Sequence, residues 1–276
     1  MTTVETTPFG RGLRHWRRVR GVSQLELAAV AGTTTRHLSF LETGRSRPSR
    51  MMVERLGEAL RVPLRERNNL LEMAGLARSY PQGDLAADDL APFRRAIDRL
   101  LASHEPYPGL VLDRGWNIIG GNRGLEAFVA GVAERNIVRL ALAAWRPRID
   151  NWREVTMALR DRVSADLMRY PDDPDLQALL DEIRAALGAA ATQEGRPWGR
   201  VICPRFLIGD QLVRTITVAA RFESAADVTL DEMRVELIYP EDEAADDFFH
   251  RAGGGHPASK SQAVDSERKA GAPPPS

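Results

Sequence analysis

The chain is poor in cysteine and has no long apolar run. Cys203 is the single cysteine among 276 residues, which excludes an internal disulfide framework and a multi-cysteine zinc site. No stretch approaches the roughly 18 uncharged apolar residues that a membrane-spanning helix needs. Residues 1–10 lack the basic and then apolar pattern of a signal peptide. We therefore expect a cytoplasmic protein without a membrane anchor.

Motifs of common enzymes are also missing. The sequence contains no Gly-x-Ser-x-Gly turn, no Gly-rich phosphate loop and no His-Glu-x-x-His pair. Its five histidines are scattered without metal-ligand spacing. We expect neither an enzyme nor a bound cofactor or metal. An enzyme whose nucleophile and base meet only after folding stays open, because sequence pattern does not show such a pair.

Positive charge is concentrated in the N-terminal third of the chain. Residues 1–80 contain 14 arginines and 7 acidic residues, a net charge of +7, whereas the remainder has 24 basic and 31 acidic residues, a net charge of −7. Phosphate groups respond to local charge and not to the total. At roughly 100 to 150 residues per domain, the chain has room for two domains. The pattern favours a nucleic-acid-binding domain followed by an acidic domain of another kind.

Residues 8–76 have the pattern of five short helices. Ser23 and Glu26 form a capping box at the start of the second helix, and Gly32 supplies the backbone freedom of the turn that follows. Thr33 or Thr34 caps the third helix, which Gly44 ends. Two short helices joined by a glycine turn of three to four residues are typical of a helix-turn-helix.

Three segments carry a resemblance to a known family: residues 21–28, residues 31–32 and residues 41–49. They resemble the lambda-repressor-like, or xenobiotic-response-element type, DNA-binding domain, and the resemblance covers residues 8–76. It implies a third helix that enters the DNA major groove and a partner that is double-stranded DNA. It also implies a backbone-contacting role for Gln24 at a helix N-terminus. The positions that it places toward the groove are Thr34, Thr35, Arg36, Ser39 and Phe40.

The chemistry of these side chains is consistent with that role. An arginine near the start of a recognition helix can donate two hydrogen bonds to guanine, which makes Arg36 the main candidate for a specific contact. Phe40 either meets a thymine methyl group or packs inside the domain. Arg45 and Arg47, in the loop after the third helix, either neutralise phosphates or belong to an ordinary solvated loop.

The rest of the chain is predicted to be an α+β domain over residues 90–250, after a short linker at residues 77–89. A hairpin signal joins the apolar runs 110–112 and 116–119. Asn151 is expected to cap a long helix, followed by a partner helix. Three strands complete the domain. The long helices are predicted at 152–170 and 174–187, and the strands at 201–208, 211–222 and 233–239. Residues 241–247 are expected to leave the last strand as a solvated acidic segment, and residues 251–276 to be a disordered tail.

Residues 104–108, 136–142 and 147–152 resemble the ligand-binding domain of MmyB-like bacterial transcription regulators. The resemblance spans roughly residues 90–250. It implies a PAS-like antiparallel sheet with flanking helices that enclose an apolar cavity, and some family members hold a long-chain fatty acid there. The predicted fold is therefore a mainly α, five-helix DNA-binding domain followed by an α+β sensor domain.

A ligand with a carboxylate head needs a cation, whereas its tail needs only apolar walls. Arg139, Arg148 and Arg214 are the candidate cations, and Asn151 is a further candidate contact. Arg214 lies on an otherwise apolar strand face, so something must satisfy its charge if it is buried. It either meets the ligand or reaches water or a local carboxylate such as Asp210.

These observations predict a cytoplasmic transcription regulator that binds DNA as a homodimer. One recognition helix reads few bases, so two half-sites about 10 base pairs apart are expected. The second domain is predicted to sense a small apolar ligand, with a fatty acid as the suggested class, and to alter operator binding. The alternative is a DNA-tethered protein that recruits another protein and has no small-molecule ligand.

Overall fold

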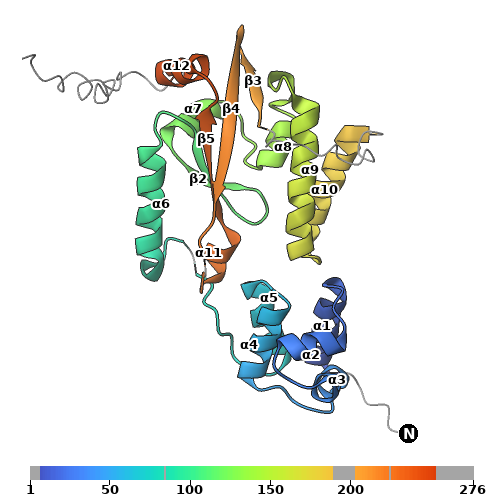
Figure 1. Cartoon of the computed structure of the whole chain (residues 1–276). Coiled ribbons are helices and arrows are strands. Elements are labelled where there is room, and N and C mark those ends of the chain that lie inside the picture. Colours follow the sequence, from blue (N-terminus) through green and yellow to red (C-terminus); the bar gives the residue numbers. More distant parts are fainter. Residues whose placement is uncertain (1–6, 84, 189–202, 224, 253–276) are drawn as a thin grey trace, which may run out of the picture.

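The computed structural model describes residues 7–83, 85–188, 203–223 and 225–252, which form two domains stacked end to end (Figure 1). The predicted disordered tail at 251–276 falls almost wholly outside the described residues, as does the start of the strand predicted at 201–208. The predicted fold class is confirmed: a five-helix domain precedes a sheet domain with flanking helices.

The N-terminal domain consists of five helices around one apolar core. The predicted capping box is formed. The Ser23 hydroxyl accepts a hydrogen bond from the backbone amide of Glu26 at 3.2 Å, and the backbone amide of Ser23 donates to the Glu26 carboxylate at 2.8 Å. Thr34, and not Thr33, caps the third helix through the His37 amide, 3.1 Å away. The helices are α1 (Pro8–Val19), α2 (Gln24–Val30), α3 (Thr35–Thr43), α4 (Arg50–Ala59) and α5 (Leu64–Met73).

The second domain is built on a five-stranded sheet in the order β2-β1-β5-β4-β3, in which all neighbouring strands are antiparallel. The predicted hairpin is the pair β1–β2, in which Leu110 lies opposite Gly121. The strands are β1 (Gly109–Leu112), β2 (Ile118–Gly121), β3 (Arg205–Ile208), β4 (Gln211–Ala220) and β5 (Arg234–Pro240).

Helices cover the two faces of this sheet unequally. One face packs on the first helix of the domain through Ile97, Leu101 and Leu237, and the other packs on the long helix pair. The helices are η1 (Asp88–Leu90), α6 (Ala91–Ser103), α7 (Arg123–Phe128), α8 (Ile137–Leu142), η2 (Arg146–Arg148), α9 (Trp152–Arg169), α10 (Pro174–Leu187), α11 (Val228–Glu232) and α12 (Glu243–Ala252).

The face of β4 that holds most of its large apolar residues turns outward. Ile216 and Val218 are 44% and 47% exposed, whereas Val213 and Thr215 on the opposite face are buried. The reason is that α6 covers the β1 and β5 part of the sheet and leaves β4 bare on this side (Figure 1). The pattern of this strand alone does not reveal which of its faces has a helix against it.

Two local predictions were wrong. The acidic segment 241–247 is mostly exposed, but it does not simply leave the last strand, because α12 begins at Glu243 and the Asp242 carboxylate accepts from the Ala245 amide at 2.9 Å. Asn151 stands before α9, but its side chain makes no capping hydrogen bond. Its side-chain nitrogen instead donates to the Cys203 carbonyl at 3.0 Å, and its side-chain oxygen accepts from the Arg205 backbone amide at 2.9 Å. These two bonds fix the start of β3.

Candidate DNA-binding surface and ligand cavity

The outer face of α3 presents the predicted groove-facing residues. Arg36 is exposed, and its guanidinium lies 5.4 Å from the centre of the Phe40 ring. Arg45 approaches the same ring at 5.9 Å. Phe40 is only half-buried and stands outside the apolar core of the domain. Thr35 and Ser39 are half-buried on the same helix, so α3 offers one aromatic ring flanked by two cations.

Behind this face, a buried carboxylate ties three helices together. Glu42 is 1% exposed and accepts from Arg17 at 2.6 and 3.1 Å and from Gln24 at 2.9 Å. Burial alone would raise the pKa of Glu42, but the bonds from Arg17 and Gln24 and the charge of Arg14 leave that pKa below its usual value. The carboxylate stays ionised and fixes α3 against α1 and α2.

The remaining predicted DNA residues lie at the edges of the α3 face. Thr34 is exposed at the start of α3, where its hydroxyl serves as the helix cap. Gln24 begins α2 and uses its amide nitrogen on Glu42. Arg45 and Arg47 are exposed in the loop after α3. The structure therefore gathers Arg36, Phe40 and Arg45 around one ring and gives Thr34 and Gln24 structural contacts within the domain.

The second domain contains an apolar cavity of about 280 Å³ between the sheet and the helices α8 and α9. We call it the inner cavity. Its volume is just below the roughly 300–1,000 Å³ of ordinary ligand pockets. Apolar walls come from Leu110, Ile137, Val155, Leu159, Phe206 and Ile238. Such a space suits a small apolar ligand, and it lies in the region where the sequence predicted one.

One end of the inner cavity is charged. Arg162 of α9 and Glu236 of β5 line it and are joined by a short ion pair. Glu236 also accepts from Arg234 at 3.1 Å, and Arg234 reaches Asp166 of α9 at 3.0 Å. The Arg234 guanidinium is 3.6 Å from the centre of the fully buried Trp116 ring. The cavity thus runs from an apolar end to a polar one.

The buried guanidinium of Arg234 is not fully satisfied. Its side chain is 4% exposed, and its Nη2 atom has no hydrogen-bond partner among the described residues. Burial lowers the pKa of Arg234 and its neighbouring carboxylates oppose that shift, but an arginine stays charged at neutral pH. Around this end three guanidinium groups, those of Arg162, Arg221 and Arg234, face the carboxylates of Asp166 and Glu236.

A second cavity of about 280 Å³ lies beside the first and shares Trp145 and Phe206 with it. Its walls are largely aromatic, including Phe128, Phe248 and Phe249. Arg148, a predicted ligand residue, lines this second cavity and is exposed.

The other predicted ligand residues do not line either cavity. Arg139 pairs with Glu182 at 2.9 Å on the surface. Arg214 lies on the exposed face of β4 and pairs with Asp242 at 3.1 Å, not with Asp210. Asn151 holds β3 in place, as described above. The three arginines that were predicted to share one ligand site therefore lie on separate surfaces of the folded domain.

Sequence reasoning missed the charged end of the inner cavity. A usable signal was present in β5, where Arg234 and Glu236 alternate with Val235 and Leu237 in an otherwise apolar strand. Strand alternation places the two charged side chains on one face. Arg162, by contrast, flanks the apolar stripe of α9 and looks like a surface residue until the strand is placed beside it.

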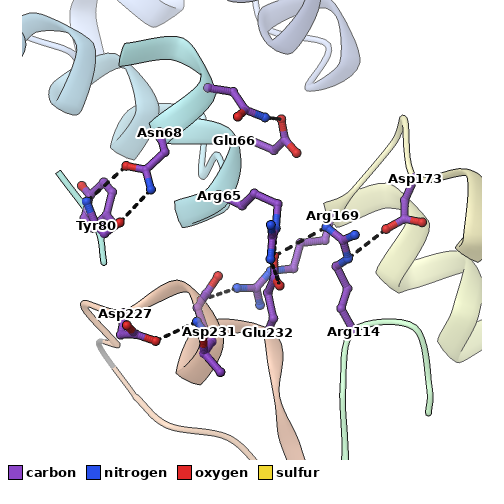
Figure 2. A network of polar contacts seen from close by, with 12 residues as sticks. Arg65, Glu66, Asn68, Tyr80, Arg114, Arg169, Asp173, Asp227, Asp231 and Glu232 are labelled. Carbon is purple, nitrogen blue, oxygen red and sulfur yellow. Dashed lines mark hydrogen bonds and ion pairs between the residues drawn. The ribbon is translucent and has the colours of Figure 1, made fainter. Parts of the chain in front are cut away.

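The two domains meet through a polar network, shown in Figure 2. Arg65 of α5 donates to both oxygens of Glu232 in α11, at 2.7 and 2.8 Å. Arg114, in the β1–β2 loop, pairs with Asp173 at 2.9 Å and lies 3.5 Å from Glu232. Arg169, at the end of α9, pairs with Asp231 of α11 at 2.6 Å.

The start of the linker is fixed on the first domain. The side-chain oxygen of the buried Asn68 accepts from the amides of Ser79 and Tyr80, each at 3.1 Å, and its nitrogen donates to the Tyr80 carbonyl at 2.8 Å (Figure 2). The predicted linker at 77–89 therefore begins with residues that are held in place by α5.

No helix in the described part of the chain is both long and apolar enough to cross a membrane. Within the same residues, no group of three or more histidine, cysteine, aspartate or glutamate side chains is arranged to hold a metal ion.

A helix-turn-helix domain with exposed arginines on its outer helix and in the loop after it, joined to a sheet domain with an internal cavity, defines a DNA-binding regulator with a sensory domain. Comparison with protein families agrees: residues 8–70 match the Helix-turn-helix domain and residues 93–252 match the MmyB-like transcription regulator ligand binding domain. The second match covers more than half of the chain, which therefore belongs to the MmyB-like transcription regulators.

A curated relative supports the class. A segment of 77 residues is 32% identical to the uncharacterized HTH-type transcriptional regulator RghRB of Bacillus subtilis (strain 168). The matched segment covers 28% of this chain and 53% of that protein, so the chain spans about half the length of this relative. The protein is a transcription regulator with a helix-turn-helix DNA-binding domain and a ligand-binding domain.

Proposed function

We propose that this regulator is a cytoplasmic homodimer that reads a specific operator through α3 and changes its operator affinity when a small apolar ligand fills the inner cavity. The observation that carries the proposal is the inner cavity itself, an apolar space of about 280 Å³ with one charged end in a domain attached to a DNA-binding domain. The proposal assigns no catalytic role to any residue.

Operator reading rests on the outer face of α3. Arg36 is exposed and lies over the face of Phe40, which holds the guanidinium in a defined orientation. A guanidinium held in this way can donate to the two acceptors of one guanine. Phe40 is the residue that we assign to a thymine methyl group. Arg45 and Arg47 supply positive charge for phosphates, and Thr34, Thr35, Ser39 and Gln24 complete the surface.

A fatty acid is the ligand class that we propose for the inner cavity. The walls are apolar and suit an acyl chain. The charged end has three guanidinium groups and two carboxylates. Its net charge is therefore positive, which favours the binding of one additional anionic group. Arg162, which lines the cavity, is the group that we assign to the carboxylate head. Arg148 holds the corresponding position in the second cavity.

The DNA-binding part is tested with variants of two arginines. Genomic fragments captured by the full-length protein supply the operator, and fluorescence anisotropy measures affinity for it and for unrelated duplexes over a range of salt. Arg36→Ala is expected to lose about 1–3 kcal/mol on the operator and little elsewhere. Arg45→Ala is expected to weaken binding to all duplexes and to lower the salt slope by about one. If both variants bind operator like the parent, the assigned contacts are wrong.

The ligand part is tested on the purified protein. Mass spectrometry of the denatured chain is expected to release an acyl carboxylate in stoichiometric amount, and a panel of fatty acids is expected to raise the melting temperature. Repeated absence of any ligand, with no thermal shift across the panel, would overturn the sensing role.

A second candidate function has its own supporting observation. Ile216, Val218 and Tyr239 are 44%, 47% and 39% exposed on the side of the sheet that α6 leaves bare, and exposed apolar patches often mark protein-binding sites. A DNA-tethered protein that recruits another protein would use this patch. Charged substitutions at Ile216 and Val218 would then abolish regulation, and the purified protein would contain no small-molecule ligand.

A further inference from the structure

The DNA-binding domain contacts the second domain at two separate places. The first contact is on α11, where Glu232 accepts both hydrogen bonds from Arg65. The linker joins it there, because the Pro81 carbonyl accepts from the Val228 amide at 2.9 Å and the Gly83 carbonyl accepts from the Thr229 hydroxyl at 2.6 Å. This α11 contact is therefore reinforced by hydrogen bonds from the linker, which continues directly from the DNA-binding domain.

The second contact is on the end of α9 and the turn before α10. Arg20, the residue after α1, donates to the carbonyls of Met168 and Arg169. His15 Nε2 lies 2.9 Å from Asp172 Oδ2, and these two side chains are 42% and 75% exposed. The linker does not reinforce this α9 contact, and ion pairs that water reaches are individually weak.

These two contacts sit on the two walls of the inner cavity. The helical wall is α9, which lines the cavity with Val155, Leu159 and Arg162. The sheet wall includes β5, which lines it with Glu236 and Ile238 and follows α11 directly in the chain. The DNA-binding domain thus bridges α9, one wall of the cavity, and α11, the helix that leads directly into β5 of the other wall.

Among the described residues, three ion pairs join α9 to β5 or α11 between the cavity and the DNA-binding domain: Arg162–Glu236, Asp166–Arg234 and Arg169–Asp231. We call these the wall ion pairs. Each has one partner on α9 and the other on β5 or α11, and the three α9 partners follow one another along the helix. They hold the two walls at the separation that the two contacts require.

We propose that the wall ion pairs control the attachment of the DNA-binding domain: an anionic ligand in the inner cavity takes Arg162 from Glu236, separates α9 from β5 and breaks the α9 contact, while the α11 contact keeps its place. This inference rests on the proposed function and specifies how the cavity regulates DNA binding.

The geometry gives the physical reason. Arg162 is 41% exposed, so it can turn toward a new carboxylate without being stripped of water on every side. Glu236 is then left to Arg234 alone, and the pairing of Arg234 with Asp166 is weakened, because Arg234 becomes the sole described partner of Glu236 while Asp166 keeps Arg221 as a second partner. Asp166 lies one turn before Arg169, the residue whose carbonyl Arg20 contacts. A shift of α9 therefore acts directly on the α9 contact, whereas the linker prevents separation from α11.

The test measures the distance between the domains in the full-length chain. Met51 and Leu207 are 60% and 41% exposed, one in each domain, and both are replaced by cysteine for spin labels in a Cys203→Ser background. Double electron–electron resonance is recorded for this parent, for Glu236→Gln and for Glu182→Gln. Glu182 is the matched control because its pair with Arg139 lies on the surface, away from both contacts. Sodium octanoate and 1-octanol are the ligand probes, of equal chain length and different charge.

The parent is expected to give one narrow distance distribution. Glu236→Gln and octanoate are each expected to raise a second population by about fivefold or more, the lower end of ordinary allosteric coupling. Glu182→Gln and octanol are expected to leave the distribution unchanged. Circular dichroism melting of each variant confirms that it is folded.

Two results would overturn the inference: a folded Glu236→Gln with the distribution of the parent, or octanoate that calorimetry shows to be bound and that leaves the distribution unchanged. A different result separates it from the proposed function. If Glu236→Gln releases the domain but neither probe nor any longer fatty acid binds, the wall ion pairs control attachment as stated, and the proposed ligand class is wrong.

Discussion

The two domains of this regulator differ in how they fill their interiors. The DNA-binding domain packs Leu13, Leu38 and Leu41 to zero exposure in one core. The sensor domain is larger and holds two cavities of about 280 Å³ each. A closed core transmits force and resists deformation, whereas a cavity leaves its lining free to rearrange. The protein therefore joins a rigid DNA-binding domain to a sensor domain that can deform.

Buried charge follows the same division. In the DNA-binding domain Glu42 is surrounded by three donors that satisfy it. In the sensor domain the buried Arg234 keeps one nitrogen without a partner, and the Trp116 ring nitrogen is likewise unsatisfied among the described residues. Saturated networks rigidify a fold, and incomplete ones mark places where a ligand or water can be accommodated.

The largest effect on stability is expected at the buried carboxylate of the DNA-binding domain. Glu42→Ala leaves the half-buried Arg17 without its counter-ion and should reduce the free energy of unfolding of the DNA-binding domain by about 3–5 kcal/mol. Native-state hydrogen exchange resolves this domain from the sensor. The control Glu182→Ala removes an exposed carboxylate and should cost at most about 1 kcal/mol. Equal losses for the two variants would mean that Glu42 does not organise the domain.

A pair of identical truncations sharpens the contrast in packing. Leu38→Ala opens a hole in a filled core and should cost the DNA-binding domain about 3 kcal/mol. Leu159→Ala removes a side chain that already faces the inner cavity, so it loses contacts on one side only and should cost the sensor domain about 1–2 kcal/mol. Denaturant unfolding followed by hydrogen exchange compares them. A cost at Leu159 that matches the cost at Leu38 would show that the cavity is closed in solution.

The smallest effect is a difference in acid sensitivity. Burial lowers the pKa of His104 in the sensor domain, against opposing hydrogen bonds to the Ile238 and Pro108 carbonyls. In the unfolded chain His104 is protonated near pH 6.5, whereas in the folded domain it is protonated only at a lower pH. The sensor domain therefore loses stability as the pH falls below about 6.5.

Glu42 gives the DNA-binding domain a different window. Its pKa is lowered in the folded state, so its stabilising contribution is complete above the unfolded value near 4.3 and is lost as the pH falls through the folded pKa. Hydrogen exchange from pH 8 to pH 4 should show the sensor weakening first. His104→Gln should remove the loss near pH 6. If the DNA-binding domain weakens first, the assignment of these two groups is wrong.

The degree to which sequence predicted structure follows the same division. The caps at Ser23 and Thr34 and the turn at Gly32, with φ of +62°, depend on neighbouring residues only. The helices of the DNA-binding domain were therefore predicted almost to the residue. In the sensor domain the helix from Pro174 to Leu187 was also predicted correctly, because its apolar stripe has a single period.

The ligand site was harder to predict because its residues come from distant parts of the chain. Arg162 and Glu236 are 74 residues apart, and nothing in either neighbourhood points to the other. Arg139 and Arg214 look equally suitable in sequence, yet each pairs with a carboxylate on the surface. A strand face with apolar residues, such as that of β4, was equally ambiguous, since its burial depends on whether a helix lies against it.

The sequence by itself determined the helices, their caps and the excess of arginine in the first domain, since these depend on neighbours within a few residues. The tertiary structure alone decided which cations face a cavity, which face of β4 meets solvent, and where the first domain rests on the second. Those outcomes depend on contacts between elements far apart in the chain, such as α9 with β5 and α11 or α6 with the sheet, and the free energy of such a contact exists only after both elements are in place.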